Sequence, residues 1–271
     1  MTMGAVAIRL DDIHGRTPVE LLHCLARELW RGKPVTYAAI PYAAPLSLGP
    51  TATTAERPGP RSARRDGPVL ELLHAVRREG SDIALHGLTH ADHKSSAGPA
   101  VPELVAIRPR RAEALISALD TWRDEFGTRV LVPPHNAIDL DFAQSLVARG
   151  YVVSRSITDG EVAELGLDTT PDGRAASKLI PPNGRPSSRS QYFQTISVSR
   201  RYIDTSKRTP TGTAGTLLRA ASEAGNATLT LHWWDFVPRS GSGHVWAYVS
   251  ELLLLLSQGA ELVPISTFDA G

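Results

Sequence analysis

Segments typical of strands alternate with segments typical of helices along nearly the whole chain, and this alternation restricts the fold more than any other feature. Short runs rich in Val, Ile and Leu predict strands at 5–10, 35–40, 81–85, 130–132, 151–153, 191–199, 227–231 and 261–265. Segments with helical periodicity, most of them ending at Gly, predict helices at 17–31, 68–80, 102–126, 139–150, 211–224 and 245–257, with Pro109 as a break or restart in the third. Such alternation builds right-handed βαβ units around a parallel sheet, open or closed.

Two long stretches interrupt this pattern. Residues at about 41–67 are rich in Pro, Ala, Thr and Gly, and residues at about 155–190 are rich in Gly, Pro and Ser. Both are expected to be long loops, which in a compact domain are usually lids, binding loops or mobile segments. The length of 271 residues fits two domains or one α/β barrel. Because the polar residues described below span both halves of the chain and have to meet at one site, we expect a single domain over 1–271.

Composition excludes several classes of protein. The 29 Lys and Arg against 28 Asp and Glu give a net charge of 29 − 28 = +1, which offers no basic field for a nucleic-acid partner. The single cysteine, Cys24, excludes a disulfide framework and is expected to be buried. The longest apolar run, Leu252 to Leu256, is far too short to cross a membrane. With no signal-like segment at the start, we expect a cytoplasmic protein without a membrane partner.

Chemically useful side chains follow the predicted strands. Asp11 and Asp12 end the first strand, His86 and His90 follow the third, and His232 follows the strand at 227–231. The carboxyl ends of strands are where barrels and doubly wound sheets carry their chemistry. We therefore expect these side chains to form one site.

A metal site is predicted from Asp12, His86 and His90. Two imidazoles and one carboxylate suit a borderline divalent ion and leave coordination positions open. The His-x-x-x-His spacing is only moderately specific, and the alternative is a pair of solvated loop histidines.

The Asp11-Asp12 pair can serve one site only under a structural condition. Successive side chains of a strand point to opposite faces, so the strand has to end or bulge there. One carboxylate would then bind the metal while the other accepts a proton. The alternative is a pair that caps the following loop.

His232 has an unperturbed pKa near working pH and is a candidate to protonate a leaving amine. Trp233 and Trp234 beside it form a possible wall for a sugar ring, although aromatic residues at strand ends also belong commonly to the core. His14 and His135 are further imidazoles near the predicted site that we assign to substrate binding, with solvated or supporting roles as the alternative.

Four motifs together resemble the polysaccharide deacetylase family, the NodB-homology enzymes of carbohydrate esterase family four. They are Leu10-Asp11-Asp12, His86-Gly87-Leu88-Thr89-His90, Val132-Pro133-Pro134-His135-Asn136 and Leu229-Thr230-Leu231-His232. Their order and their strand-end positions are similar to the family pattern, and the set is much more specific than any one motif.

The resemblance implies a single distorted (β/α)7-type barrel that hydrolyses N-acetyl or similar N-acyl groups with a divalent metal. It implies Asp11 as general base, His232 as general acid, and Asp12, His86 and His90 as ligands. The ion implied is zinc, with cobalt, nickel or manganese as alternatives. The loop with Pro134, His135 and Asn136 would bind substrate and supply a backbone N–H to the oxyanion.

The sequence also departs from the family pattern. Val132 and His135 stand where the third motif usually has a base-orienting arginine and a tyrosine, which leaves Arg9 or another basic residue to orient the base. We therefore expect a divergent branch that acts on an amino sugar or a small sugar-containing metabolite. The alternatives are hydrolysis of an ester or a formamide, and a non-catalytic carbohydrate-binding protein.

Overall fold

A computed structural model describes residues 4–41, 67–94, 100–156, 176–180, 192–206, 208–237 and 242–269. The loop predicted at 41–67 lies almost wholly outside these ranges, and so does most of the loop predicted at 155–190. The description below concerns the residues within them.

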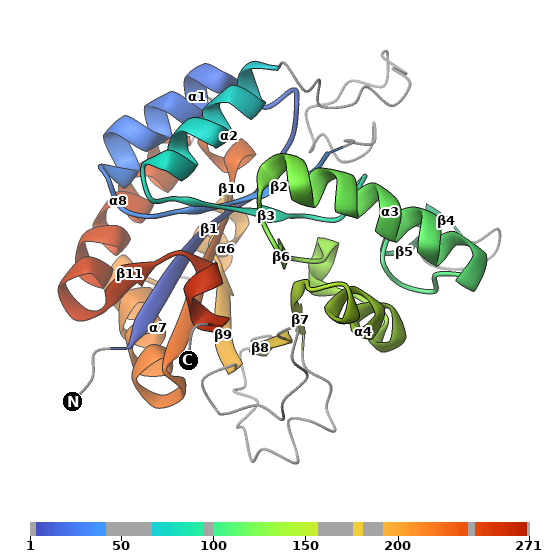
Figure 1. Cartoon of the computed structure of the whole chain (residues 1–271). Coiled ribbons are helices and arrows are strands. Elements are labelled where there is room, and N and C mark those ends of the chain that lie inside the picture. Colours follow the sequence, from blue (N-terminus) through green and yellow to red (C-terminus); the bar gives the residue numbers. More distant parts are fainter. Residues whose placement is uncertain are drawn as a thin grey trace.

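Nine of the described strands form one closed sheet (Figure 1). Its members are β1 (Ala5–Ile13), β2 (Thr36–Ala39), β3 (Asp82–Leu85), β6 (Val130–Leu131), β7 (Val152–Ser156), β8 (Ala176–Ile180), β9 (Tyr192–Ser197), β10 (Asn226–His232) and β11 (Glu261–Val263). The order is β10-β9-β8-β7-β6-β3-β2-β1-β11, and a further pairing of β10 with β1 closes the ring. Neighbouring strands run parallel except at β8, which is antiparallel to β7 and β9.

Of the nine strands, β8 is antiparallel and β11 only extends the edge of β1 at Ala5 to Ala7, so 9 − 2 = 7 parallel strands remain, and β8 completes the wall between β7 and β9. This is the distorted (β/α)7 barrel that the sequence predicts. The carboxyl ends of its parallel strands all open at one end of the ring, which gathers the residues that follow them.

Helices surround the strands in Figure 1. They are α1 (Val19–Cys24), the π-helical η1 (Leu25–Trp30), α2 (Pro68–Arg78), α3 (Pro109–Phe126), α4 (Leu140–Ala148), α6 (Arg200–Ser206), α7 (Pro210–Ala224) and α8 (Ser242–Gly259). Short 3-10 turns are η4 (Pro134–Asn136), η6 (Trp233–Phe236) and η7 (Ile265–Asp269), and β4 (His93–Lys94) pairs with β5 (Ala100–Val101) in a small hairpin. None of the described helices combines the length and the apolar character that crossing a membrane requires.

The alternation of side chains along β1 divides the molecule into an outer and an inner core. Val6, Ile8 and Leu10 pack into the large cluster that the surrounding helices complete. Ala7 belongs to a second cluster made of strand residues and η7, with no helix outside the ring contributing to it, and Arg9 lies on the same face as Ala7. The interior is therefore apolar near the amino ends of the strands and becomes charged toward their carboxyl ends.

Three expectations are corrected. Of the helix predicted at 102–126 with a break or restart at Pro109, only the part from Pro109 on is helical, because proline disfavours helical geometry in the residue before it and Arg108 is extended (φ −67°, ψ 141°). The helix predicted from Thr17 begins at Val19, and the Thr17 hydroxyl accepts the His14 N–H at 3.0 Å instead of capping the helix. The stretch predicted as loop at 155–190 contains β8, which pairs with β7 and β9, the strands before and after it in the sequence, but whose own five residues show no period-two alternation.

Candidate metal centre and active site

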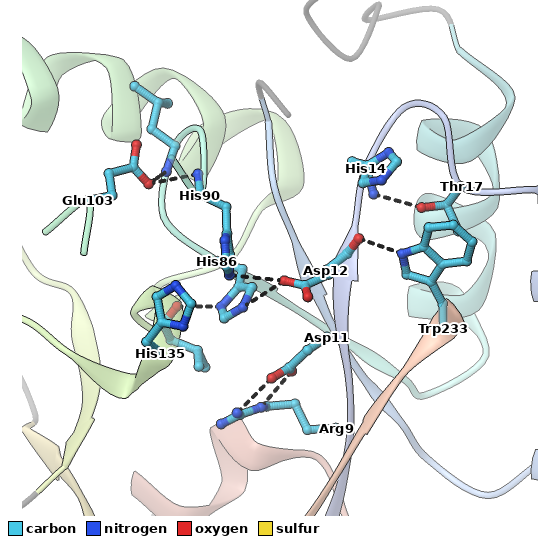
Figure 2. Close-up of polar contacts among 12 residues, drawn as sticks. Arg9, Asp11, Asp12, His14, Thr17, His86, His90, Glu103, His135 and Trp233 are labelled. Atoms are coloured by element: carbon cyan, nitrogen blue, oxygen red, sulfur yellow. Dashed lines mark hydrogen bonds and ion pairs between the residues drawn. The ribbon is translucent and has the colours of Figure 1, made fainter. Parts of the chain in front are cut away.

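A bulge in β1 allows Asp11 and Asp12 to serve the same site. Asp12 has a left-handed backbone (φ 64°), and the register of β1 against β2 shifts between Leu10 and Ile13. The Trp233 indole N–H donates to the Asp12 carbonyl at 2.9 Å and holds the bulge. Figure 2 shows both carboxylates turned toward the side of His86. The condition placed on this pair by strand alternation is thus met by a bulge.

Asp12, His86 and His90 converge on one point. The Asp12 Oδ1 atom lies 3.2 Å from His86 Nε2 and 3.2 Å from His90 Nε2 (Figure 2). One potential ligand atom from each of the three residues lies within 4.8 Å of the others. Asp12 and His86 are buried and the His90 side chain is 13% exposed, so the cluster is open mainly on the His90 side.

The hydrogen bonding of this cluster fits a bound cation. His86 Nδ1 lies 2.8 Å from the Val132 carbonyl, which can only accept, so Nδ1 carries the hydrogen. In the neutral ring the Nε2 lone pair is therefore directed at Asp12 Oδ1, a buried atom that accepts no hydrogen bond within the described residues. Lone pairs that face each other in a buried site are satisfied by a metal ion, and a histidine oriented by a second hydrogen bond is the usual metal ligand.

The pKa values of the cluster indicate the same preference for positive charge. Burial on its own would raise the pKa of Asp12, but the neighbouring imidazoles, His86 above all and then His90, outweigh it and lower the pKa to about 2. Burial would lower the pKa of His86, but Asp12 and Asp11 outweigh it and raise that pKa. Burial and the charge of His86 together lower the pKa of His90. An ionised Asp12 thus attracts either a proton or a metal to its neighbours.

Asp11 is held by Arg9 from the same strand. The Arg9 Nε donates to Asp11 Oδ1 at 2.7 Å and Nη2 donates to Oδ2 at 2.8 Å, and both side chains are buried. Burial would raise the pKa of Asp11, but the charge of Arg9 is the main influence that overcomes it and holds the pKa below its ordinary value. Asp11 is therefore an ionised carboxylate beside the cluster of Asp12, His86 and His90.

His232 lies beside Asp11 across the β1–β10 pairing. The two residues are register partners on these parallel strands. The His232 ring stacks on Trp234 with 4.6 Å between centroids, and its Nδ1 lies 3.9 Å from Asp235 Oδ2. The His232 side chain is 24% exposed, which leaves the ring accessible from outside.

The loop after β6 forms the rim next to His90. His135 and Asn136 both have left-handed backbones (φ 56° and 53°), and the His135 ring lies 4.9 Å from the His90 ring. The His135 side chain is half exposed and its Nε2 lies 3.3 Å from Asp92 Oδ1. Pro134 is buried.

The backbone of this loop keeps one amide for a ligand. The Asn136 N–H donates to Pro133 O at 2.9 Å and the Ala137 N–H donates to Pro134 O at 3.0 Å. Pro134 has no N–H, and the N–H of His135 has no hydrogen bond to the described residues. The His135 amide is thus the group of this loop that can donate to a substrate oxygen.

Two residues that were predicted to bind substrate, His14 and Trp233, are buried. His14 is 2% exposed, and its Nδ1 accepts the Arg16 N–H at 3.0 Å. Its ring meets Trp233 edge-on at 5.6 Å, and Trp233 is itself buried. Burial, with a smaller contribution from Arg16, lowers the pKa of His14 to about 4 against the opposing pull of Asp12. The two side chains therefore belong to the packing around the carboxyl end of β1.

Sequence reasoning missed or only half identified three polar neighbours of the site. Arg9 was expected only as one candidate to orient the base, although its period-two spacing from Asp11 on a strand is a usable signal. Asp235 lies three residues after His232, a spacing that carries no signal outside a regular helix. Glu103, whose carboxylate holds the loop of His90, belongs to no recognisable motif.

No protein-family model matches this sequence, and no curated protein matches it significantly. Its fold is similar to that of a family 4 acetyl xylan esterase from Clostridium thermocellum in complex with a cobalt ion. That alignment has a TM-score of 0.51 and 10% identity, and it covers 98% of this chain and 90% of that one. The chitin deacetylase from the fungal pathogen Colletotrichum lindemuthianum is similar as well, with a TM-score of 0.51, 14% identity, and coverage of 99% and 88%. At these identities the similarity establishes the fold, which is the one that the sequence motifs imply.

Proposed function

We propose that this chain, built on the barrel of the family 4 esterases and deacetylases, is a metal-dependent hydrolase that removes an N-acetyl or similar N-acyl group from an amino sugar or small sugar-containing metabolite. One observation carries the proposal. The cluster of Asp12, His86 and His90 lies next to an ionised carboxylate, Asp11, that a buried arginine holds in place.

Asp12, His86 and His90 would hold the metal. Their one oxygen and two nitrogen donors suit Zn²⁺, with Co²⁺, Ni²⁺ and Mn²⁺ as alternatives, and three protein ligands leave positions for water and substrate. When bound, a divalent ion supplies a Lewis acid that polarises the acyl carbonyl and makes water a better nucleophile.

Asp11 and His232 would move the protons. Asp11 is ionised and buried, so it can take a proton from the attacking water, and Arg9 fixes its direction. His232, on the adjacent strand end, would give a proton to the departing nitrogen, which releases a carboxylate and a free amine. The His135 N–H would donate to the oxyanion that forms as water adds.

The substrate would lie between His135 and Trp234. His135 and Asn136 come from the rim next to His90, and Trp234 stacks on the opposite side of the site against His232. Trp234 is only partly buried, so part of its ring stays exposed and can contact a sugar ring. His14, Pro134 and Trp233 would act indirectly, by holding the strand end and the loop.

The Arg9–Asp11 pair favours catalysis over a carbohydrate-binding role. Loss of the arginine and the tyrosine from the third motif is the reason for considering a non-catalytic protein. Arg9 provides a two-point contact to the same base from another position, so the base is still oriented. An ester or a formamide would use the same groups, and only the bond that breaks would differ.

The test is acetate release from N-acetylglucosamine and its short oligomers. The protein would be assayed with added Zn²⁺ or Co²⁺ and after chelation, beside Asp11→Asn and the exposed control Asp204→Asn on α6. We expect activity that chelation removes, that Asp11→Asn lowers by about 10²–10⁴-fold, and that Asp204→Asn leaves unchanged. Activity indifferent to both chelation and Asp11→Asn would contradict the proposal.

The same preparation separates the alternatives. Acetate esters and formamides at equal concentration identify a different scissile bond if they react faster than the N-acetyl sugar. Sugar binding that persists in His232→Ala, without turnover under any metal, would identify a binding protein instead.

A further inference from the structure

The carboxylate of Glu103 lies inside the loop that presents His90. Its Oε1 accepts the Thr89 N–H at 2.8 Å and the Thr89 hydroxyl at 2.6 Å. Its Oε2 accepts the N–H groups of Leu88 and His90, both at 3.0 Å. Figure 2 shows the bond to His90. Glu103 is 2% exposed, and every one of these contacts is a donor, so the ionised carboxylate is the form that fits.

These contacts determine the shape of the loop. Three successive N–H groups turn toward one side and form a concave anion site, which the Glu103 carboxylate fills from 13 to 15 residues away. Gly87 and His90 at the two ends of this stretch have left-handed backbones (φ 69° and 53°). A Cβ on Gly87 would collide with Glu103 Oε2 and with Pro134, so the carboxylate also occupies the space that glycine leaves.

The shape of the loop places the second imidazole of the metal cluster. His86 is held by β3 and by its bond to the Val132 carbonyl. His90 lies four residues further on, in a backbone conformation that non-glycine residues rarely adopt. The Glu103 bond to the His90 N–H holds that backbone while His90 Nε2 lies 3.2 Å from Asp12 Oδ1. Without the carboxylate, three buried or half-buried amides would turn toward other acceptors and carry His90 with them.

We propose that Glu103 is a positioning residue for the metal site, which fixes His90 by filling the anion site of residues 88–90. The proposal rests on the proposed function, because it takes the ligand of Asp12, His86 and His90 to be a divalent metal. It assigns an effect on metal affinity to a residue that acts through the backbone of the His90 loop and is not itself a proposed ligand.

The experiment measures Co²⁺ affinity by titration and by the visible absorption of bound Co²⁺. Glu103→Gln keeps the volume of the side chain but puts an NH₂ donor among the N–H donors. Thr89→Val removes the hydroxyl donor to Oε1 and, with it, the acceptor of the Ala91 N–H at 3.2 Å. We expect Glu103→Gln to weaken Co²⁺ binding by about 10–100-fold and to change the absorption of the bound ion, as losses of supporting partners do in other metal sites. Thr89→Val should have a smaller effect in the same direction.

Asp139→Asn is the matched control. The Asp139 Oδ2 accepts the Ile107 N–H at 3.2 Å, so it too ties a carboxylate to the backbone of the segment that contains Glu103. It has no hydrogen bond to residues 88–90. The Co²⁺ affinity of Asp139→Asn and the absorption of its bound Co²⁺ should equal those of the unchanged protein.

Amide hydrogen exchange of the metal-free protein gives a second reading. Glu103→Gln should speed exchange at residues 88–90, and Asp139→Asn should not.

If the unchanged protein binds no Co²⁺, the proposed function fails and this inference fails with it. If the unchanged protein binds and Glu103→Gln binds equally well, only the role of Glu103 is overturned. Should Glu103→Gln not fold, unchanged affinity in Thr89→Val would likewise overturn that role.

Discussion

Arg9 and Asp11 lie two residues apart on β1, and the guanidinium of Arg9 donates to both carboxylate oxygens of Asp11, at 2.7 and 2.8 Å. Residues two apart on a strand share a face, so both side chains enter the barrel interior together. The pair thereby gives the proposed base a fixed direction from within its own strand. Because both groups are buried, removal of either one is expected to destabilise the protein, since the other would stay buried without its partner.

Arg9→Met should destabilise the protein by about 3–5 kcal/mol at pH 7, because it leaves the Asp11 carboxylate buried without its partner. Arg9→Lys keeps a charge but loses the two-point contact, and it should destabilise the protein less than Arg9→Met. Urea unfolding measures both, and Arg9→Met/Asp11→Leu should recover most of the loss. In Arg9→Met the acidic limb of kcat/KM should move to higher pH, since Arg9 no longer holds the Asp11 pKa down. Equal stability of Arg9→Met and the unchanged protein would show that the pair is not coupled.

His232→Gln should lower kcat by about 10²–10⁴-fold while Co²⁺ affinity stays the same, because His232 moves a proton but does not belong to the ligand cluster. Steady-state kinetics and metal titration on the same samples provide both readings. His244→Gln, at an exposed histidine of α8, is the control and should change neither. A loss of metal binding in His232→Gln would place His232 among the ligands instead.

Zinc should stabilise the protein through the three-ligand cluster. Zn²⁺ at 100 times its dissociation constant should add about 2.7 kcal/mol to the free energy of unfolding, visible as a rise in Tm that chelation reverses. His90→Ala should lose this increment and His135→Ala should keep it, although the two rings lie only 4.9 Å apart. If both variants lose the increment equally, the ligand set has to be extended to His135.

His14 should make stability depend on pH below neutrality. Its pKa falls from 6.5 to about 4 on folding, so the unfolded chain binds the extra proton between these values. The contribution of the neutral ring is complete above pH 6.5 and is lost as the pH falls toward 4, by up to about 3 kcal/mol. His14→Asn keeps an acceptor for the Arg16 N–H but does not titrate. In metal-free buffer the unchanged protein should lose about this much more than the variant between pH 7 and 4, and parallel profiles would contradict the prediction.

Much of the barrel could be predicted because its signals are local. Apolar residues at period two identify β1 and β10, and glycine stops identify the ends of α2, α3 and α7. β8 was not predicted because its own five residues, Ala-Ser-Lys-Leu-Ile, show no period-two alternation and lie in a stretch rich in Gly, Pro and Ser. The polar residues at strand ends were found for the same local reason, since each follows directly on an apolar run.

The sequence alone thus predicted a parallel sheet and a common site for Asp12, His86 and His90, because strand periodicity and strand-end position depend on neighbouring residues. The closure of the sheet into a barrel was implied by the resemblance of the four motifs to a known family. Only the tertiary structure decided how the site is held. The bulge at Asp12 depends on Trp233, 221 residues away, and the loop of His90 depends on Glu103. It also decided that His14 and Trp233 are buried. Such contacts join segments whose own residues give no indication of the partner segment, so they form only when the closed sheet brings the two segments together.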